Sequence, residues 1–502
     1  MNKKYGLIII VVSILLICFT SIGIFIMKEK RNDQSKLLFW TNSAPFSTDP
    51  MDYDAFIHHI VFRSTYSSMV TEYSSGGPTG ILAKSWKASD DFKTWTLFVR
   101  DDVTFENGDK ITPEIIVKSL TRIAYLLKKG NSETGLFNHM LGYESFNKIS
   151  DKLIGIEYDS NSITLKFDRP KNDLLDIISF GLYGIAHPSD YDQVTGEWKD
   201  KKKFISSGSY KIIQWNKDSI VLQLRDDFLS TIGHKNKFKT IEITWDPNRK
   251  EEADAMDGLN IDLNVRNDLT FYGGAPSGIM YLRCISWTNP DSPFYQLSDR
   301  QKIRDIFYSE VEKAGFKPTR SFFPLIMKGI RDFKSGNVDS NVLANSKVKV
   351  LKHSSLRSIY LYSNPTMEAL KNTGKNFNLE VNAITTPYDE LIKEISPGLP
   401  SYKVDLAVLG TDIFVEQPEH DIRFMFLSKE GIQLPDAKGS IIAHLKKHEA
   451  LDVQMINQEL WDQAIIWPLT HYSSGFRAKD FVDVSILNVL KNPIDFMWVG
   501  HK

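Results

Sequence analysis

The sequence predicts a protein that mixes strands with helices and folds into two or more lobes. The chain has 502 residues, which is more than one hydrophobic core normally organises. Hydrophobic residues make up 42% of the chain, enough for a sizeable core. Residues 95–127 show both kinds of element in one short run, because a strand pattern is followed there by a turn signal and an amphipathic helix pattern.

The charge balance argues against a strong attraction to polyanions. Lys and Arg number 61 against 62 Asp and Glu, which gives a net charge of −1, whereas nucleic-acid binding depends on many basic side chains that neutralise phosphates. We therefore expect no nucleic-acid partner.

The two cysteines, Cys18 and Cys284, lie far apart in the sequence and form no CxxC motif, so neither a disulfide nor a cysteine-based metal site is expected.

Residues 7–27 form an uncharged apolar run near the amino end. As a helix they would span about 31 Å, enough to cross a bilayer. We favour an uncleaved membrane anchor over a cleaved signal peptide, because residues 21–23 are a poor cleavage site and the apolar run is long. A lipoprotein signal would use Cys18, but the bulky Ile17 precedes it. Residues 28–36 are polar and predict a short tether.

The run from residue 95 to residue 127 predicts a strand, a tight turn and a helix, in that order. Residues 95–99 alternate between apolar and more polar types, the period of a strand with a buried face. Asn107-Gly108 supplies the positive φ angles that a tight turn needs. Thr112 is placed to cap the helix, and a proline follows it at the first helical position. The expected apolar face of the helix consists of Ile116, Val117, Leu120, Ile123, Ala124 and Leu127.

Residues 81–120 carry several short motifs in a fixed order. They are a Leu-Ala, a Ser-Trp, an Asp pair, the alternating strand, a Phe before a Gly turn, and a helix that starts at a Thr. This series resembles the signature region of the family 5 extracellular solute-binding proteins, the peptide- and nickel-binding components of ABC importers. Further matches follow the family's order: Asp49-Pro50, the segment 207–211 with Trp215, the segment 254–262, Trp287-Thr288-Asn289, and Trp467-Pro468-Leu469.

The resemblance implies an α/β fold, a two-lobed periplasmic-binding-protein-like (type II) clamp with an extra subdomain in the first lobe, preceded by one N-terminal transmembrane helix. The implied parts are a membrane anchor and tether at 1–35, lobe I at 36–76, 204–273 and 466–502, an inserted subdomain at 77–203, and lobe II at 274–465. Hinge strands would cross near residues 270 and 466. A solute would lie between the lobes, which close only if it binds the closed form more tightly than the open form.

Peptide binders of this family resemble one another in a lobe II segment where a strand ending in Gly-Trp is followed by an Asp that neutralises the peptide's amine. The matching run is residues 404–424, in which Thr411 replaces the Trp and Phe414 replaces the Asp if no gap is opened. Asp412 stands two residues earlier. Two interpretations stay open. With a rebuilt loop, Asp412 meets an amine. Without one, Asp412 is an ordinary turn residue, and the ligand is something other than a free-amine peptide, or there is none.

Aromatic residues are the other candidates for the ligand site, because such sites have largely apolar walls with a few oriented polar groups. Trp40, Trp287, Trp461 and Trp467 include possible wall residues. For each of them the alternative is a place in the hydrophobic core. Trp461 in particular lies in a helical apolar pattern, so the predicted ligand-binding set is Asp412, Trp40, Trp287 and Trp467.

Catalytic and metal-binding motifs in the sequence are weak. His444 and His448 stand four apart, a spacing that permits zinc binding from one helical face, but the Glu follows the second His instead of lying between them. Exposed helix surface is the simpler interpretation. The Gly-rich run 272–278 lacks the Lys of a phosphate-binding loop, and its proline favours a bend between the lobes. We expect no catalytic residue, no metal and no cofactor.

Taken together, the anchor and the resemblance imply an extracytoplasmic solute-binding protein. Residues 7–27 would hold it at the cell membrane, with the folded part on the periplasmic or cell-surface side. It would capture a small solute, with oligopeptides as the favoured class, and deliver it to an ABC permease. Two alternatives stay open: a sensory or regulatory ectodomain that uses the same clamp, and a degenerate scaffold that binds protein partners.

Overall fold

The structure is a computed structural model that describes residues 35–502 with gaps. The ranges left out are 42–43, 53–55, 75–76, 131–134, 138, 230–231, 260–265, 274–277, 326, 328–329, 335–345, 354–363, 387–403, 413–421, 423–424, 428–433, 435–440, 446–451 and 486–494. The predicted anchor at 7–27 and Cys18 lie outside the described residues. Within the described part, no helix combines the length and the apolar character that a membrane crossing requires.

Lobe I is built on a seven-stranded sheet with the order β12-β18-β11-β1-β10-β9-β8. Its strands are β1 (Lys36–Trp40), β8 (Tyr210–Trp215), β9 (Ser219–Leu224), β10 (Thr240–Thr244), β11 (Ala255–Leu259), β12 (Thr270–Gly273) and β18 (Ser474–Ala478). Strand β1 runs parallel to β10 and β11, and the other pairs are antiparallel. Helix α2 (Phe56–Thr65) buries its apolar residues in the core of this lobe.

Four short elements complete lobe I at its surface and near the carboxyl end. They are the 3-10 turns η2 (Pro247–Arg249) and η5 (Phe496–Trp498) and the strands β19 (Val482–Asp483) and β20 (Gly500–His501). The side chains of η5 are buried in the core of lobe I. The carboxyl end of the chain therefore contributes to the same lobe as its first described strand.

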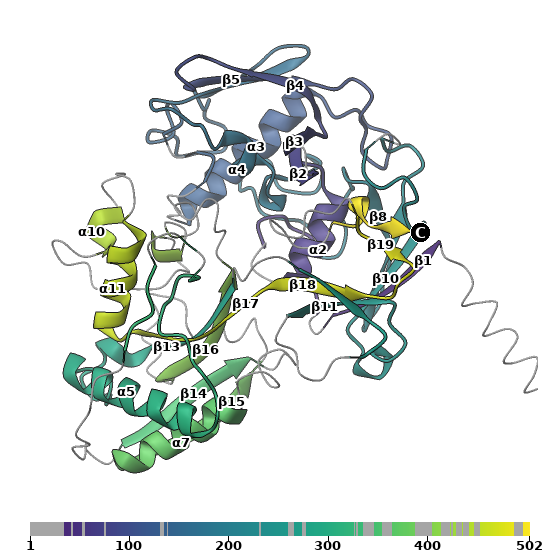
Figure 1. The fold of residues 1–502 in the computed structure, drawn as a ribbon. Helices are drawn as coiled ribbons and strands as arrows, with labels where there is room; N and C mark the ends of the chain where they lie inside the picture. Colours follow the sequence, from purple (N-terminus) through teal and green to yellow (C-terminus); the bar gives the residue numbers. More distant parts are fainter. Residues whose placement is uncertain are drawn as a thin grey trace, which may run out of the picture.

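A subdomain follows β2 (Val70–Ser74) and β3 (Gly77–Gly80) and has its own core. It contains a four-stranded sheet in the order β4 (Ala83–Ala88), β5 (Thr94–Val99), β7 (Ser162–Lys166) and β6 (Ile156–Tyr158). Its helices are α3 (Pro113–Lys129), α4 (Leu174–Ile178) and the 3-10 turn η1 (Gly181–Tyr183). In Figure 1 this subdomain forms the upper part of the molecule.

The structure confirms the strand, turn and helix predicted for residues 95–127. Trp95, Leu97 and Val99 are buried along β5, as their alternation predicts. Gly108 has φ of +89° in the tight turn. The Thr112 side chain accepts a hydrogen bond from the Ile115 amide at 3.4 Å and so caps α3. The sequence was enough to predict this stretch, because helix caps, turns and strand alternation each depend on residues that are close together in the sequence.

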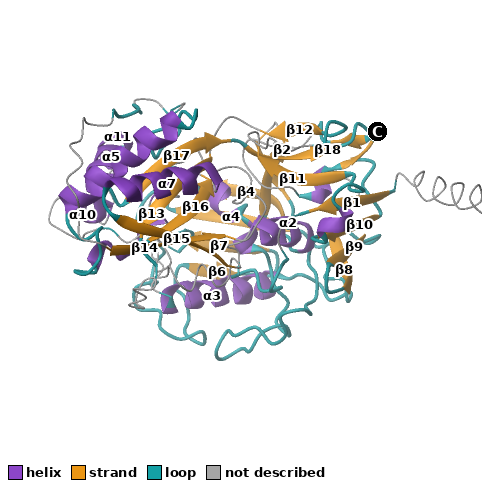
Figure 2. Cartoon of the chain, turned by 90° about the horizontal axis from the view of Figure 1, so that it is seen from below, coloured by secondary structure: helices purple, strands orange, loops and turns teal. Residues whose placement is uncertain are grey.

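Lobe II has a five-stranded sheet in the order β15-β14-β16-β13-β17. The strands are β13 (Gly278–Cys284), β14 (Ser346–His353), β15 (Leu379–Thr386), β16 (Leu406–Asp412) and β17 (Ile466–Tyr472). The helices are α5 (Leu297–Lys313), α7 (Asn364–Asn376), α10 (Ile441–Leu445), α11 (Val453–Gln463) and the 3-10 turn η3 (Ser286–Thr288). Figures 1 and 2 show α5 and α7 packed side by side on this lobe.

Strand β13 lies between two hydrophobic cores, which explains why nearly every residue in it is apolar. Met280 and Leu282 belong to the core on one face, and Ile279 and Tyr281 belong to the core on the other. All seven of its residues are buried, including the free thiol of Cys284. A strand covered on both faces loses the alternation of a half-exposed strand.

Two neighbouring stretches of chain connect the lobes. One runs from β12 to β13 and the other from β17 to β18, which Figure 1 shows as a continuous yellow path. Strand β17 starts at Ile466 and pairs with β13 inside the lobe II sheet. The return crossing therefore follows Tyr472, whereas the sequence analysis placed it near residue 466. The apolar run at 465–469 belongs to the lobe II core, so its start does not mark the hinge.

Candidate functional site

The carboxyl ends of the parallel strands in both lobes lie next to the two crossings. In lobe I, Leu259 at the end of β11 pairs with Ser474, the first residue of β18 after the return crossing. In lobe II, Asp412 at the end of β16 pairs with Gly278, the first residue of β13 after the outward crossing. Ligands of α/β proteins bind outside the carboxyl ends of parallel strands. The candidate site is therefore the region between these two strand edges.

Glycines allow close packing at the crossings. A Cβ atom at Gly278 would overlap the ring of Tyr472, and one at Gly410 would lie 3.3 Å from the Tyr472 hydroxyl oxygen. The Tyr472 ring thus extends from β17 across β13 toward β16. On the lobe I side, a Cβ at Gly475 would overlap the backbone of β12. The lack of a side chain at Gly278 and Gly475 therefore lets neighbouring groups pack directly against the backbone of β13 and β18 next to the crossings.

The loop that follows β1 starts at the carboxyl edge of lobe I and is fixed by several hydrogen bonds. The Thr41 hydroxyl donates to the Asp257 carboxylate at 3.3 Å. The Tyr66 hydroxyl donates to the Thr48 carbonyl at 2.7 Å, and the Trp198 indole donates to the Thr48 hydroxyl at 3.0 Å. These partners come from lobe I and from the inserted subdomain, so both parts hold the loop.

A buried ion pair fastens the end of the same loop to the inserted subdomain. The Arg122 guanidinium on α3 donates to both carboxylate oxygens of Asp49, at 2.9 and 2.6 Å. The Arg122 side chain is 1% exposed and lies over the rings of Tyr191 and Trp198, 5.0 Å from each centroid. Bidentate charge-assisted bonds of this kind fix geometry as well as adding energy.

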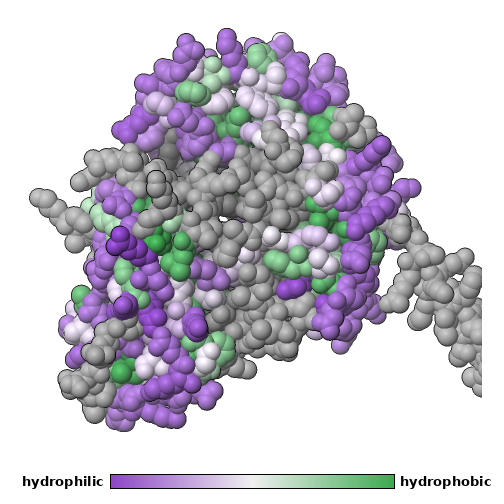
Figure 3. All heavy atoms as spheres, in the orientation of Figure 1, coloured by the Kyte–Doolittle hydropathy of each residue, from purple (hydrophilic) through white to green (hydrophobic). Residues whose placement is uncertain are grey.

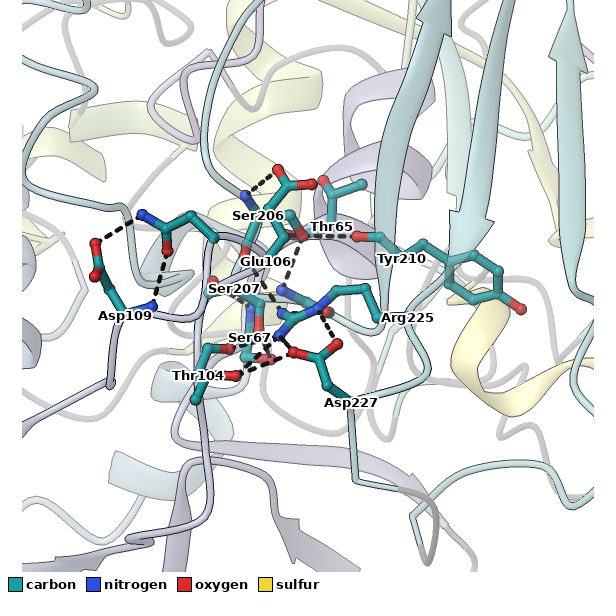
Figure 4. A network of polar contacts seen from close by, with 12 residues as sticks. Thr65, Ser67, Thr104, Glu106, Asp109, Ser206, Ser207, Tyr210, Arg225 and Asp227 are labelled. Carbon is teal, nitrogen blue, oxygen red and sulfur yellow. Dashed lines mark hydrogen bonds and ion pairs between the residues drawn. The ribbon is translucent and has the colours of Figure 1, made fainter.

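A second buried arginine links lobe I to the inserted subdomain (Figure 4). Arg225, which follows β9, donates to the carbonyl oxygens of Gly208 at 3.1 Å and Thr104 at 2.9 Å. It also makes a bidentate pair with Asp227. Nearby, the Ser206 hydroxyl is 2.7 Å from the Thr65 carbonyl oxygen. The hairpin at 104–110 is thereby held against lobe I.

Buried carboxyl groups occur at this same junction. Burial raises the pKa of Asp190 to about 6, although the hydrogen bond from the Ile205 amide to its carboxylate acts to lower this pKa. Burial also raises the pKa of Asp495 to about 7, although Arg63 and Lys237 act to lower it. Asp495 and Arg63 line a cavity of about 20 Å³ with Ser179 of the inserted subdomain.

The predicted ligand-binding residues lie in three different environments. Trp40 ends β1 at the carboxyl edge of lobe I, is 4% exposed, and donates its indole N–H to the Asp246 carbonyl at 3.0 Å. Trp467 is fully buried in the lobe II core and donates to the Ala464 carbonyl at 2.8 Å. Trp287 is half-buried beside that core. Trp287 and Trp467 thus pack in one cluster of lobe II, whereas Trp40 packs in a small cluster of lobe I, and their assignment to the ligand site stays a prediction.

Asp412 lies at the carboxyl edge of lobe II, as the last residue of β16. Its backbone position beside the crossing is described, but its side chain is not, and Phe414 falls in the range 413–421 outside the described residues. The assignment of Asp412 as an amine anchor stays a prediction.

Of the two histidines considered for zinc, His444 lies in α10 and His448 is outside the described part. Within the described residues, no cluster of three or more His, Cys, Asp or Glu side chains could hold a metal ion.

Comparison with known proteins gives the same architecture. Residues 77–270 match the bacterial extracellular solute-binding proteins, family 5 Middle. This part of the chain is similar to the family 5 extracellular solute-binding proteins. Over 172 residues the chain is 23% identical to the dipeptide-binding protein DppE of Bacillus subtilis, covering 34% of the chain and 31% of DppE. The oligopeptide-binding protein OppA of the same organism is 21% identical over 353 residues, covering 64% and 62%. The aligned part spans less than two thirds of either relative.

Solved structures extend the likeness in fold over nearly the whole chain. Haemophilus influenzae OppA in complex with RPPGFSPFR matches with a TM-score of 0.73 at 15% identity, over 94% of this chain and 99% of that one. DppA from Helicobacter pylori in complex with the peptide STSA matches with a TM-score of 0.71 at 16% identity, over 95% and 99%. The predicted two-lobed type II clamp is confirmed as the fold. The predicted transmembrane helix before it lies in the part not described.

Sequence reasoning missed the residues that fix the loop after β1 and the inserted subdomain. Arg122 lies on the side of α3 nearly opposite the predicted apolar face, where a charged residue is ordinary, so its burial carried no signal in the sequence. Its partner Asp49 was noted only as part of an Asp-Pro motif. Tyr472 and Arg225 carried no local signal, because their partners lie on other strands and loops.

Proposed function

We propose that this protein is an extracytoplasmic solute-binding protein that captures an oligopeptide between its two lobes and delivers it to an ABC permease. The observation that carries the proposal is the position of two strand edges, one in each lobe, on either side of the paired crossings. The printed names and ligands of DppE, OppA and the two peptide complexes support peptide as the solute class. They also favour capture and transport over the sensory and scaffolding alternatives.

In the proposed mechanism, lobe I and the inserted subdomain move as one body and lobe II moves as the other. The Asp49–Arg122 pair and the Arg225 contacts support the first body, because each links lobe I to the subdomain through buried charge-assisted hydrogen bonds. The two crossings would take up the rotation. The solute shifts the population toward the closed form by its tighter binding to that form.

For the peptide's amine, we propose Asp412 as the anchor. Its support is its place at the carboxyl edge of lobe II, in the run where the family's peptide binders have their ligand Asp. A carboxylate facing a desolvated ammonium forms a strong charge-assisted hydrogen bond. The test is Asp412→Asn, for which we expect at least a tenfold loss of affinity for a free-amine peptide and little change for its N-acetylated form. Equal affinities of the variant and the wild type for the free-amine peptide would reject the anchor.

The membrane anchor and the permease also belong to this proposal. Residues 7–27 supply an apolar run long enough to span a bilayer, and the polar residues after it would tether lobe I to the extracytoplasmic face. Fractionation of cells that produce the tagged chain, followed by protease treatment of intact cells or spheroplasts, tests this topology. We expect the chain in the membrane fraction with its folded part accessible to protease from outside.

The decisive experiment on function is a binding screen of the full chain in mild detergent. A ligand that binds the folded form raises the apparent melting temperature. We expect stabilisation by members of a mixed peptide library and none by sugars at the same concentration. Titration calorimetry with the best peptide then gives the affinity, and a screen in which no peptide binds would refute the proposal.

A further inference from the structure

The loop that leaves the carboxyl end of β1 carries an exposed aromatic side chain, Phe46. Phe46 lies between the strand end at Trp40 and the buried segment 47–50, and it is 41% exposed. Its neighbours on the C-terminal side are buried: Ser47, Thr48, Asp49 and Pro50. An exposed ring within an otherwise buried segment is the feature that requires an explanation here.

A side chain of helix α2, His58, binds the backbone of Phe46. The Phe46 amide donates to Nε2 of His58 at 3.1 Å, and the two rings meet edge to face with centroids 4.2 Å apart. His58 is fully buried and stacks on Phe62 at 5.1 Å. Burial lowers the pKa of His58 to about 4, so the ring stays neutral near pH 7 and Nε2 remains an acceptor.

The segment just after Phe46 is fixed as well. Thr48 receives two hydrogen bonds, from the Tyr66 hydroxyl and the Trp198 indole, and Asp49 is held by Arg122. A side chain on such a segment loses little conformational freedom when it binds a partner, because its backbone is already ordered. Rigidly presented aromatic rings are efficient contact surfaces for apolar groups.

Phe92 shows what an ordinary exposed phenylalanine looks like in the same molecule. It is also 41% exposed, but it lies in the turn between β4 and β5, with φ of +53°, and its ring packs on Trp95 with centroids 6.0 Å apart. Single exposed apolar residues of this kind need no functional explanation. Phe46 differs because its segment leaves the strand edge beside the crossings and is held by two parts of the protein.

We propose that Phe46 is a specificity-determining residue of the solute site, where its ring forms an apolar surface for one side chain of the bound peptide. This inference rests on the proposed function. It predicts that one position of the peptide prefers Phe or Leu to Asp or Lys, and that the preference depends on Phe46.

The test compares the full chain in detergent with its Phe46→Ala, Phe46→Glu and Phe92→Ala variants. Alanine-based pentapeptides that carry a single Phe, Leu, Asp or Lys at each position in turn serve as probes in titration calorimetry. We expect the wild type and Phe92→Ala to prefer an apolar residue at one position by about tenfold, and Phe46→Ala to lose that preference. Phe46→Glu is expected to prefer Lys at the same position. Unchanged melting temperatures and circular dichroism spectra exclude misfolding as the cause.

The outcomes separate this inference from the proposed function. If the wild type binds peptides and Phe46→Ala keeps the same preference at every position, Phe46 is not a specificity residue although the peptide-binding function stands. If Phe92→Ala loses the preference as Phe46→Ala does, a special role of Phe46 is also rejected. If the wild type binds none of the peptides, the proposed function fails and the inference fails with it.

Discussion

The two junctions of lobe I differ in how they are made. Its junction with the inserted subdomain contains two arginine side chains, Arg122 and Arg225, each 1% exposed. Across the boundary, Arg122 donates to the Asp49 carboxylate and Arg225 donates to the Thr104 carbonyl. Its junction with lobe II consists of two crossings, and the described residues that flank them include Gly273, Gly278 and Gly475. Figure 3 shows mostly hydrophilic side chains along the outer edges of the molecule, with apolar patches between them. The comparison indicates that the junction of lobe I with the inserted subdomain is a fixed joint, and that its junction with lobe II is a hinge.

The fixed joint is expected to be most sensitive to loss of Arg122. Its replacement in Arg122→Ala leaves the Asp49 carboxylate buried without its bidentate partner, and we expect a loss of about 3–5 kcal/mol in the free energy of unfolding. Urea denaturation followed by tryptophan fluorescence measures it. Lys118→Ala on the same helix removes an exposed ion pair with Glu114 and should cost less than about 0.5 kcal/mol. Similar costs for the two variants would contradict the assignment of the joint.

The hinge should respond to added volume instead of lost charge. In Gly278→Ala the new methyl group overlaps the Tyr472 ring, so we expect a loss of about 1–3 kcal/mol and a changed angle between the lobes. Small-angle X-ray scattering reports the angle, and urea denaturation reports the stability. The double variant Gly278→Ala/Tyr472→Ala should recover the wild-type radius of gyration.

Gly130→Ala is the matched control for the hinge variant. Gly130 follows α3 with φ of −79°, and a Cβ there would meet its nearest neighbour at 3.4 Å. We expect the lobe angle and the stability of this control to stay close to those of the wild type. A lobe angle unchanged in Gly278→Ala would show that the crossings do not set the opening.

The smallest expected effect is a pH dependence of the fixed joint, through Asp495. Its folded pKa of about 7 lies above the unfolded value of about 3.9, so the folded state binds the proton more tightly. The resulting stabilisation is present at low pH and is lost as the pH rises from about 4 to about 7. We expect the stability difference between wild type and Asp495→Asn to change by about 1–2 kcal/mol between pH 6 and pH 7.5.

Other titrating groups act on both proteins and cancel in this difference. His58 has a folded pKa of about 4, below its unfolded value, and therefore stabilises the fold more as the pH rises toward about 6.5. Asp190 acts in the same direction as Asp495. Asparagine retains an oxygen that can accept the hydrogen bond from the Met497 amide. A difference that does not vary with pH would show that Asp495 is not titrating in the joint.

Local patterns predicted much of the fold, and contacts between distant residues explain what they missed. The cap at Thr112 and the alternation in β5 depend on neighbours in the sequence and were predicted correctly. The return crossing was misplaced because one apolar run contains both the core strand β17 and the residues just before the hinge. Trp467 shows the same ambiguity, since an aromatic residue in such a run fits a core as well as a ligand wall.

The candidate site was harder to predict than the fold. Its position depends on which strand ends meet at the crossings, and this follows from pairing between segments far apart in sequence, such as Leu259 with Ser474. Phe46 was passed over because a lone Phe beside an Asp-Pro motif carries no periodic signal. Its exposure becomes informative only once the hydrogen bonds of its loop are known.

The pairing of β12 with β18 has a consequence for the modular construction of the chain. Gly273 and Gly475 face each other in adjacent antiparallel strands, so everything between them leaves and re-enters lobe I at the same place. Lobe II is thus an insertion between β12 and β18, and a short hairpin linker could replace it without breaking the strand pairing of the seven-stranded sheet. The same two attachment points would accept the corresponding lobe of a relative, which makes chimaeras of exchanged selectivity feasible.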